Sequence, residues 1–242
     1  MRAGSVTFRT DIEAFISRDV LDACTVAHRF ELPPVAGVFY IAAIDPAGGS
    51  GADSKTVTIA HAELRDDVVV IVVDAVREVK PPFSPEAVVA DFATLLHTYN
   101  VTAITGDRWG GEWPREAFAK QGIVYEIAAK PKSDVYRDVL PLLNSGRVEL
   151  LDHPRLLAQF AALERRTARG GRESIDHPPH SHDDLANSTA LAVDVALQAA
   201  VPMMNTDMTD EEYRALRRLV THPGEISGFP PGEIAGNFLS DF

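Results

Sequence analysis

The sequence is poor in cysteine, long apolar runs and positive charge, and each of these deficits excludes a class of protein. Cys24 is the sole cysteine, so an internal disulfide is excluded and the composition fits a reducing cytoplasm. The most apolar stretch, Val68 to Val73, is closed by Asp74 and is far too short to span a bilayer. The N-terminus lacks the continuous apolar segment of a secretory signal. We therefore expect a soluble cytoplasmic protein with no membrane partner.

Positive charge is outweighed by acid, and the formal net charge is -12. This balance excludes a protein whose whole surface attracts nucleic acid, but it allows a local basic groove beside an acidic site. Gly48, Gly49 and Gly51 are not followed by the Gly-Lys-Ser/Thr of a phosphate-binding loop, so we find no nucleotide-driven motor. With 242 residues, 45% of them hydrophobic, the chain can bury one sizeable core.

Turn-forming residues and charge divide the chain into three expected parts. Residues 1–36 are expected to be a linker or approach segment, in which Pro33-Pro34 stops any helix before the core begins. Residues 37–201 carry the regular apolar patterns of the main domain. Residues 202–242 are acidic and interrupted by Pro and Gly, so we expect a loosely packed tail.

The main domain reads as three strands followed by alternating helices and strands. The expected strands are 38–45, 56–64, 68–76, 101–106, 123–127 and 147–151. The expected helices are 85–98, 112–121, 133–144, 154–166 and 183–200, with a Gly-rich basic loop or hairpin at 165–176. A capping box at Thr10-Asp-Ile-Glu13 predicts a further short helix near the N-terminus.

Short turns between the first three strands imply antiparallel pairing, and a right-handed crossover can place the fourth strand parallel to the first. The predicted fold is therefore α/β. It is a mixed five- to six-stranded sheet, three antiparallel strands and then parallel ones, with helices on both faces.

Acidic residues stand where expected strands end and where the last helix begins. Asp45 follows the first strand, Asp107 follows the fourth, and Asp183 and Asp184 open the helix 183–200. Each has a simpler explanation as a turn, a helix cap or a helix-dipole partner. Because ligands gather at the carboxyl ends of neighbouring parallel strands, we expect these acids to converge.

A cluster of carboxylates is suited to hard divalent cations such as Mg²⁺ or Mn²⁺. Without a metal the cluster would be unfavourable, because like charges raise one another's pKa. Two ions roughly 3.5–4 Å apart can activate water and stabilise the leaving oxygen of a phosphodiester. We therefore predict a metal-dependent nuclease whose ions are held by three acidic sites, Asp45, Asp107 and the adjacent pair Asp183 and Asp184.

Histidines lie close to the third acidic site, at His177, His180 and His182. They would allow a zinc site, but no cysteine stands nearby and the intervening prolines hold an extended chain. We favour His182 as an extra ligand or proton carrier beside magnesium. Asp53 is a candidate supporting acid, for which a solvated loop is the alternative.

Basic residues concentrate in two stretches that a DNA backbone could contact. The candidates are Lys130, Lys132, Arg137, Arg165, Arg166, Arg169 and Arg172. A solvated surface explains them equally well. If they bind double-stranded DNA through its phosphates, the affinity should depend on salt and show little sequence preference.

Three motifs together resemble the nuclease domain of the large terminase subunit of tailed bacteriophages. They are Ile44-Asp-Pro-Ala-Gly-Gly-Ser-Gly-Ala-Asp53, Thr105-Gly-Asp-Arg-Trp-Gly-Gly-Glu-Trp113 and His182-Asp-Asp-Leu-Ala-Asn187. The resemblance covers roughly residues 35–200, and Thr10 to Pro34 resembles the segment that joins motor to nuclease. It implies a ribonuclease-H-like fold, two Mg²⁺ or Mn²⁺ ions, and cutting of concatemeric viral DNA during genome packaging in the bacterial host cytoplasm.

By the same resemblance, Asp45, Asp107 and one of the adjacent acids are the metal ligands. We favour Asp184, with Asp183 in support. The implied partners are double-stranded DNA and a packaging ATPase, small terminase subunit or portal protein. The ATPase of the full family pattern has no counterpart in this sequence, so we expect cutting rather than translocation.

Two other functions remain open. Another ribonuclease-H-like nuclease, of the junction resolvase or RNase H type, uses similar acids and would differ in its preferred substrate. A non-catalytic module that docks on DNA or on a portal protein would bind without metal and would not cut.

Overall fold

The structure is a computed structural model, and it describes residues 12–46, 53–107, 112–167 and 173–200. The chain divides into two units, residues 1–200 and 201–242, and every described residue belongs to the first. The described strands are β1 (Ile12–Ala14), β2 (Thr25–Val26), β3 (Tyr40–Asp45), β4 (Lys55–Arg65), β5 (Val68–Val79), β6 (Ala103–Gly106), β7 (Val124–Ile127), β8 (Val148–Leu151), β9 (Glu164–Thr167) and β10 (Glu173–Asp176). The described helices are α1 (Arg18–Cys24), α2 (Pro85–Thr98), α3 (Glu112–Ala119), α4 (Lys132–Asn144), α5 (Pro154–Ala162) and α6 (Asp184–Ala200).

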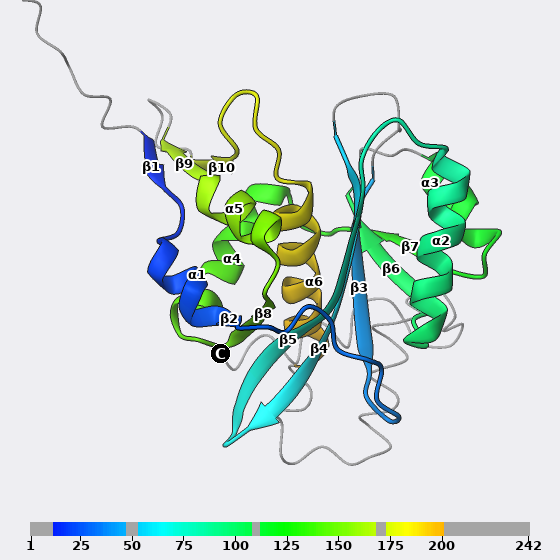
Figure 1. The fold of residues 1–242 in the computed structure, drawn as a ribbon, viewed down its shortest axis with the longest axis horizontal. Helices are drawn as coiled ribbons and strands as arrows, with labels where there is room; N and C mark the ends of the chain where they lie inside the picture. The colour runs from blue at the N-terminus through cyan, green and yellow to red at the C-terminus, as the bar shows by residue number, and fades with distance from the viewer. Residues whose placement is uncertain (1–11, 47–52, 108–111, 168–172, 201–242) are drawn as a thin grey trace, which may run out of the picture. The chain divides into compact units, whose positions relative to one another are not determined.

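A mixed sheet occupies the centre of the first unit (Figure 1). Among the described residues it has seven strands, in the order β2-β8-β5-β4-β3-β6-β7. Strands β3, β4 and β5 are antiparallel, whereas β6, β7, β8 and β2 each pair parallel with a neighbour. The predicted α/β fold, with antiparallel strands followed by parallel ones, is confirmed. The sheet exceeds the expected five or six strands because the two-residue strand β2 extends its edge.

The antiparallel half of the sheet follows directly from the sequence. Strand β5 is rich in β-branched residues, and Ile71 to Val76 are buried because helices cover both faces. Asp66 and Asp67 join β4 to β5 with φ angles of 50° and 63°. Positive φ at both central residues is the conformation that a two-residue hairpin turn of the I′ type requires.

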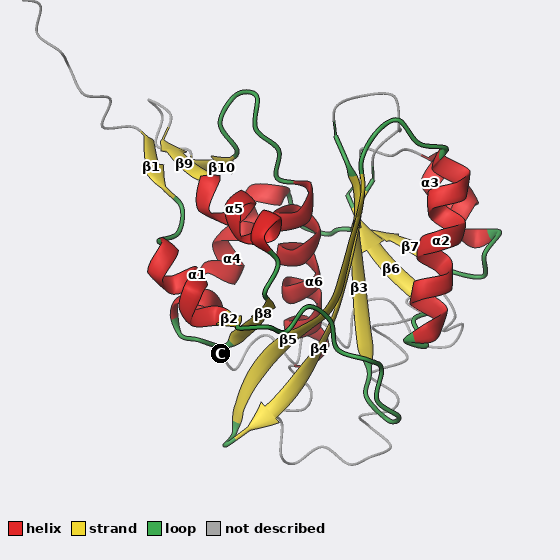
Figure 2. Ribbon diagram, viewed as in Figure 1, coloured by secondary structure: helices red, strands yellow, loops and turns green. Residues whose placement is uncertain are grey.

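Helices cover both faces of the sheet, as the sequence predicted (Figure 2). Helices α2 and α3 contribute Phe92, Leu96 and Phe118 to the core on one face. Helices α1, α4, α5 and α6 form the core on the other face. Helix α6 is the most enclosed of these, and its Ser188 and Thr189 hydroxyls lie within hydrogen-bonding distance of side chains on β4.

Two sequence predictions at the ends of helices were wrong. Thr10 and Asp11 of the capping box lie outside the described residues, and the helix expected from it is not found over Ile12–Ala14, which instead pairs antiparallel with β9; α1 begins only after Ser17. The helix expected over 154–166 ends at Ala162, because Glu164–Thr167 forms β9 of the hairpin. β1 is distant from β9 in the chain, whereas β9 and β10 form a local hairpin, and in both cases strand pairing overrides the local helical preference.

The described part of residues 1–36, expected as a linker, contributes to the core of this unit. Leu21 and Cys24 of α1 are buried, and β2 pairs parallel with β8. The expected tail, residues 202–242, lies outside the described residues. None of the helices described is long and apolar enough to cross a membrane.

Candidate metal centre

Strands β3 and β6 bring two acids to the same end of the sheet. They pair parallel, with Ala43 opposite Thr105 and Ile44 opposite Gly106, so Asp45 and Asp107 stand at neighbouring strand ends. The Tyr125 hydroxyl donates a hydrogen bond to the main-chain oxygen of Asp107 at 2.9 Å. The side-by-side strand ends follow from the crossover that the sequence predicted.

The two other acids lie at the N-terminus of α6, where the helix dipole favours negative charge. Asp183 and Asp184 are 5% and 6% exposed. The main-chain amide of Ser54 donates to Asp184 Oδ2 at 3.0 Å, and the Thr56 hydroxyl donates to the Asp184 main-chain oxygen at 2.8 Å. The start of β4 therefore holds this end of the helix.

All four acids line one cleft of about 620 Å³. Asn187, one turn into α6, donates from Nδ2 to Asp45 Oδ2 at 2.7 Å and so joins the helix to the end of β3. The other described residues of the lining are Pro46, Asp53, Ala128, Ala129, Lys130, Pro131, Lys132 and His177. Of the sequence candidates, Asp45, Asp53, Asp107, Lys130, Lys132, Asp183 and Asp184 thus meet in one place.

Burial and neighbouring negative charge raise the pKa of two of these acids, Asp45 and Asp184. Burial raises the pKa of Asp45 well above its usual range, and the charges of Asp184, Asp107 and Asp183 add to this effect, while the hydrogen bond from Asn187 opposes it. Burial also raises the pKa of Asp184, against the hydrogen bond from Ser54. Because a bound cation would relieve this repulsion and hard cations prefer oxygen ligands, the donor set fits a divalent ion such as Mg²⁺ or Mn²⁺.

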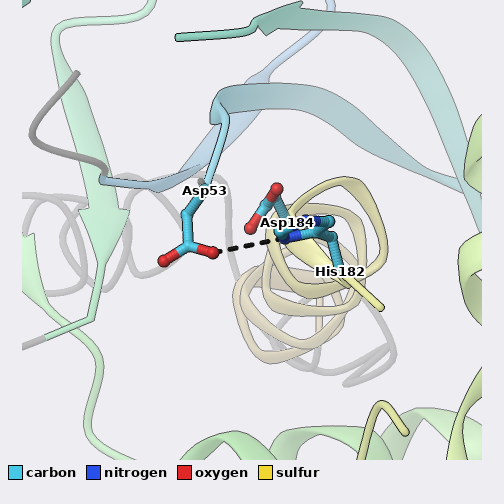
Figure 3. Close-up of side chains that lie close together, drawn as sticks. All are labelled: Asp53, His182 and Asp184. Atoms are coloured by element: carbon cyan, nitrogen blue, oxygen red, sulfur yellow. Dashed lines mark hydrogen bonds and ion pairs between the residues drawn. The ribbon is translucent and has the colours of Figure 1, made fainter. Parts of the chain in front are cut away.

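Asp53, His182 and Asp184 lie together at the edge of this cluster (Figure 3). One potential ligand atom from each lies within 4.8 Å of the others, and His182 Nδ1 is 3.3 Å from Asp53 Oδ1. His177 belongs instead to a group with Asp176 and Asp183. In the described part of the chain the histidines are therefore divided between groups and form no three-histidine zinc site.

Asp183 has its own set of partners on α4. The Tyr136 hydroxyl donates to Asp183 Oδ2 at 3.0 Å, and Lys132 Nζ lies 3.1 Å from the same oxygen. Lys132 also contacts Asp176 Oδ1 at 2.7 Å. Burial, together with the charge and hydrogen bond of Asp183, raises the pKa of Tyr136 well above its usual range. The phenol is therefore a hydrogen-bond donor at neutral pH.

The described basic candidates are mostly engaged with acids. Lys130 forms ion pairs of 2.8 Å with Asp138 and Asp194. The other pairs are Lys132 with Asp176 and Asp183, Arg137 with Asp134, and Arg166 with Glu164. Arg137, Arg165 and Arg166 do not line the cleft, and Arg165 lies on β9. Arg169 and Arg172 lie outside the described residues.

Three residues of this region are not predicted from the sequence as part of the site: Tyr136, Asp176 and Gln159. Tyr136 sits on the apolar face of α4 and reads as core. The Gln159 side-chain oxygen accepts hydrogen bonds from the main-chain amides of Leu185 and Ala186 at 2.8 and 3.1 Å, and so caps α6. Asp176 could have been predicted, because it directly precedes His177 in the stretch rich in acids and histidines.

Comparison with known proteins matches residues 42–195 to the family model described as the terminase RNaseH-like domain. Comparison with curated proteins finds no match. The large terminase nuclease of the thermophilic phage G20c with bound magnesium is 17% identical, with a TM-score of 0.61 over 76% of this chain and 96% of that one. The nuclease domain of the Thermus phage P74-26 large terminase is 18% identical, with a TM-score of 0.53 over 74% and 94%.

The large terminase of bacteriophage HK97 is also similar, at 19% identity and a TM-score of 0.59. The match covers 76% of this chain but 44% of the HK97 chain. At these identities the solved structures establish a shared fold.

Proposed function

Because the chain belongs to the terminase RNaseH-like domain family, we propose that it is a divalent-metal-dependent endonuclease that cuts double-stranded DNA during packaging of a tailed-phage genome. The observation that supports this most strongly is the cleft at the ends of β3 and β6, lined by Asp45, Asp107, Asp183 and Asp184. Four carboxylates at one cleft are hard to reconcile with a purely structural role, because they destabilise one another.

The proposed cofactors are two Mg²⁺ or Mn²⁺ ions, held by Asp45, Asp107 and Asp184 with Asp183 in support. When bound, such ions would activate water and neutralise the charge that develops on the leaving oxygen of the phosphodiester. The G20c nuclease has been solved with bound magnesium, with cobalt and with zinc, and this supports divalent-metal use.

The protein's own residues orient the carboxylates. Asn187 fixes one oxygen of Asp45 at 2.7 Å, and the Ser54 amide fixes one oxygen of Asp184 at 3.0 Å. Each hydrogen bond restricts the rotation of its carboxylate, and this lowers the conformational entropy that the side chain loses when an ion is bound. His182, beside Asp53, is proposed to carry protons to or from the cleft.

The proposed substrate is the DNA backbone, and Lys130 and Lys132 are the described basic residues that line the cleft. We propose that their ammonium groups attract phosphates while Asp194 and Asp176 hold them in place. As partners we propose a packaging ATPase, a small terminase subunit or a portal protein, in the cytoplasm of the bacterial host.

The test is cutting of supercoiled plasmid in Mg²⁺, in Mn²⁺ and in EDTA. We expect nicked and linear products with either metal and none in EDTA. Asp45→Asn and Asp184→Asn should each lower the rate by at least about 100-fold, because loss of an outer-shell partner alone lowers activity 10- to 100-fold. Asp91→Asn, on the exposed face of α2, is the matched control and should cut normally.

Two outcomes would replace the proposal. A strong preference for four-way junctions or for RNA–DNA hybrids over linear duplex would indicate a resolvase or an RNase H. DNA binding by folded wild-type protein, independent of metal and without any cutting, would indicate a docking module.

A further inference from the structure

Tyr136 combines a core position with a polar contact to the metal centre. Its side chain is fully buried, and its ring packs near those of Phe15 and Phe160, with centroids 5.6 and 6.5 Å away. Its hydroxyl donates to Asp183 Oδ2 at 3.0 Å. A phenylalanine would fill the same space, so packing alone does not account for the hydroxyl group.

The Asp183 side chain does not cap α6, although its position directly before the helix suggests that role. An acid at the start of a helix commonly accepts hydrogen bonds from the first free amides. Here the Gln159 side chain accepts the hydrogen bonds from Leu185 and Ala186 instead. The Asp183 carboxylate points back to α4, where Tyr136 and Lys132 both contact Oδ2.

Fixing Asp183 also fixes the first turn of α6. The Asp183 main-chain oxygen accepts from the amide of Asn187 at 2.7 Å. The next residue along is Asp184, and the Asn187 side chain holds Asp45 at 2.7 Å. A displacement of Asp183 would therefore move two groups at the centre together, one carboxylate and the amide that orients another.

We infer that Tyr136 is a positioning residue of the metal centre, which fixes Asp183 and, through it, the first turn of α6. This inference rests on the proposed function, because it assigns Tyr136 a part in preparing the same site for its ions. Residues that orient metal ligands typically contribute about 10- to 100-fold to metal affinity or activity. Tyr136 needs no contact with the ion or the DNA for such an effect.

Tyr136→Phe tests the inference, because it removes one oxygen atom and leaves the ring. The variant is expected to fold, since Lys132 Nζ still contacts Asp183 Oδ2 at 3.1 Å. The measurement is the Kd for Mn²⁺ by isothermal titration calorimetry without DNA, with folding checked by circular dichroism. We expect the Kd to rise about 10- to 100-fold. Plasmid cutting should recover when Mn²⁺ is raised by the same factor.

The matched control is Tyr99→Phe. Tyr99 is also buried, and its hydroxyl donates to the main-chain oxygen of Leu32, among residues that do not line the cleft. Its removal should leave the Kd for Mn²⁺ unchanged. A wild-type Kd in Tyr136→Phe, or an equal rise in both variants, would overturn the inference.

A double-mutant cycle with Asp183→Ala, which removes the oxygen that accepts from the Tyr136 hydroxyl, tests the route of the effect. If Tyr136 acts through Asp183, adding Tyr136→Phe to Asp183→Ala should change the Kd by less than about twofold, because residues in one network are not additive. A further rise by the full factor of the single variant would show that Tyr136 acts elsewhere. Wild-type protein that binds no Mn²⁺ and cuts no plasmid would refute the proposed function, whereas normal wild-type binding with an unaffected Tyr136→Phe refutes the inference alone.

Discussion

Two buried carboxylates among the described residues, those of Asp74 and Asp45, have different neighbours. Asp74, in the middle of β5, is 1% exposed and has His61 Nδ1 at 2.8 Å from its Oδ2. Asp45 faces three other acids across the cleft. Asp74 therefore has a partner within the protein, whereas the repulsion around Asp45 would be relieved by a cation bound from solution. For this pair of residues, neighbouring side chains rather than burial distinguish the structural acid from the candidate ligand.

His61 should make folding stability depend on pH. Burial lowers its pKa, but the hydrogen bonds and charges of Asp74 and Glu63 outweigh this effect, and the pKa is raised above the ordinary 6.5. A raised pKa in the folded state contributes stability that is fully present below the ordinary pKa and is lost as pH rises through the raised one. We expect His61→Gln to remove this part of the pH dependence.

The measurement is the free energy of unfolding in urea as the pH is raised from about 5 to about 8, the range in which histidine changes its charge. Wild type should lose stability relative to His61→Gln as the pH rises. His97→Gln, at an exposed site on α2, is the control and should follow wild type. A difference between wild type and His61→Gln that stays constant with pH would contradict the account.

At the scale of elements, local signals were sufficient where a helix is capped by its own sequence. Helix α2 runs from Pro85 to Thr98 as predicted, with Ser84 as its cap. The sequence could not predict the strand at Ile12–Ala14, because its partner β9 lies far away in the chain. The early end of α5 follows from the hairpin of β9 and β10, which the sequence offered at 165–176, but its start at Glu164 could not be read from the helical pattern.

The acids of the centre were predictable because they occupy positions with a general rule, the ends of strands and of a helix. Tyr136 and Gln159 follow no such rule. Each lies among buried apolar residues of its own helix, and its polar partner lies on α6. A contact between two helices that are distant in sequence leaves no trace in the spacing of residues within either one.

The absence of a side chain at Gly106 allows β6 to pack closely against Tyr125 and Ile44. An added Cβ would lie 2.6 Å from Tyr125 Cζ and 2.8 Å from Ile44 Cγ2, and closer still to the Tyr125 hydroxyl. Gly106→Ala should therefore destabilise the fold by about 1–3 kcal/mol, as overpacking does. It should also displace Asp107, the next residue, and weaken Mn²⁺ binding.

Urea unfolding and Mn²⁺ calorimetry measure the two effects of Gly106→Ala separately. Replacing Tyr125 by Leu in the Gly106→Ala background removes the atoms of closest approach and should recover part of the stability. If Gly106→Ala has wild-type stability and Mn²⁺ affinity, the close packing of β6 is not needed to place Asp107.

For the molecule as a whole, the excess of negative charge disfavours nonspecific binding of nucleic acid. The net charge is -12, and Lys130 and Lys132 in the cleft are already paired with acids. On the proposed function, few described basic groups of the cleft would attract DNA, and bound cations would add to them. Metal binding and DNA binding are thus expected to be coupled, both through the same cleft.

Folding stability and metal binding depend on the same acids, so they should respond in opposite ways to one substitution. The raised pKa of Asp45 means that its ionised form destabilises the folded protein at neutral pH, since stability falls as pH rises past the ordinary pKa of 3.8. Asp45→Asn removes this charge and can still accept the hydrogen bond from Asn187. The variant should be more stable than wild type without metal.

The most direct test is the melting temperature of wild type and Asp45→Asn, in EDTA and in Mn²⁺. In EDTA we expect Asp45→Asn to melt at least about 2 °C higher, the shift that about 1 kcal/mol gives in a domain of this size. Mn²⁺ at 100 times its Kd should stabilise wild type by about 2.7 kcal/mol and the variant far less, so that the order reverses. A wild type that is the more stable in EDTA, and that Mn²⁺ leaves unchanged, would contradict a metal centre built on Asp45.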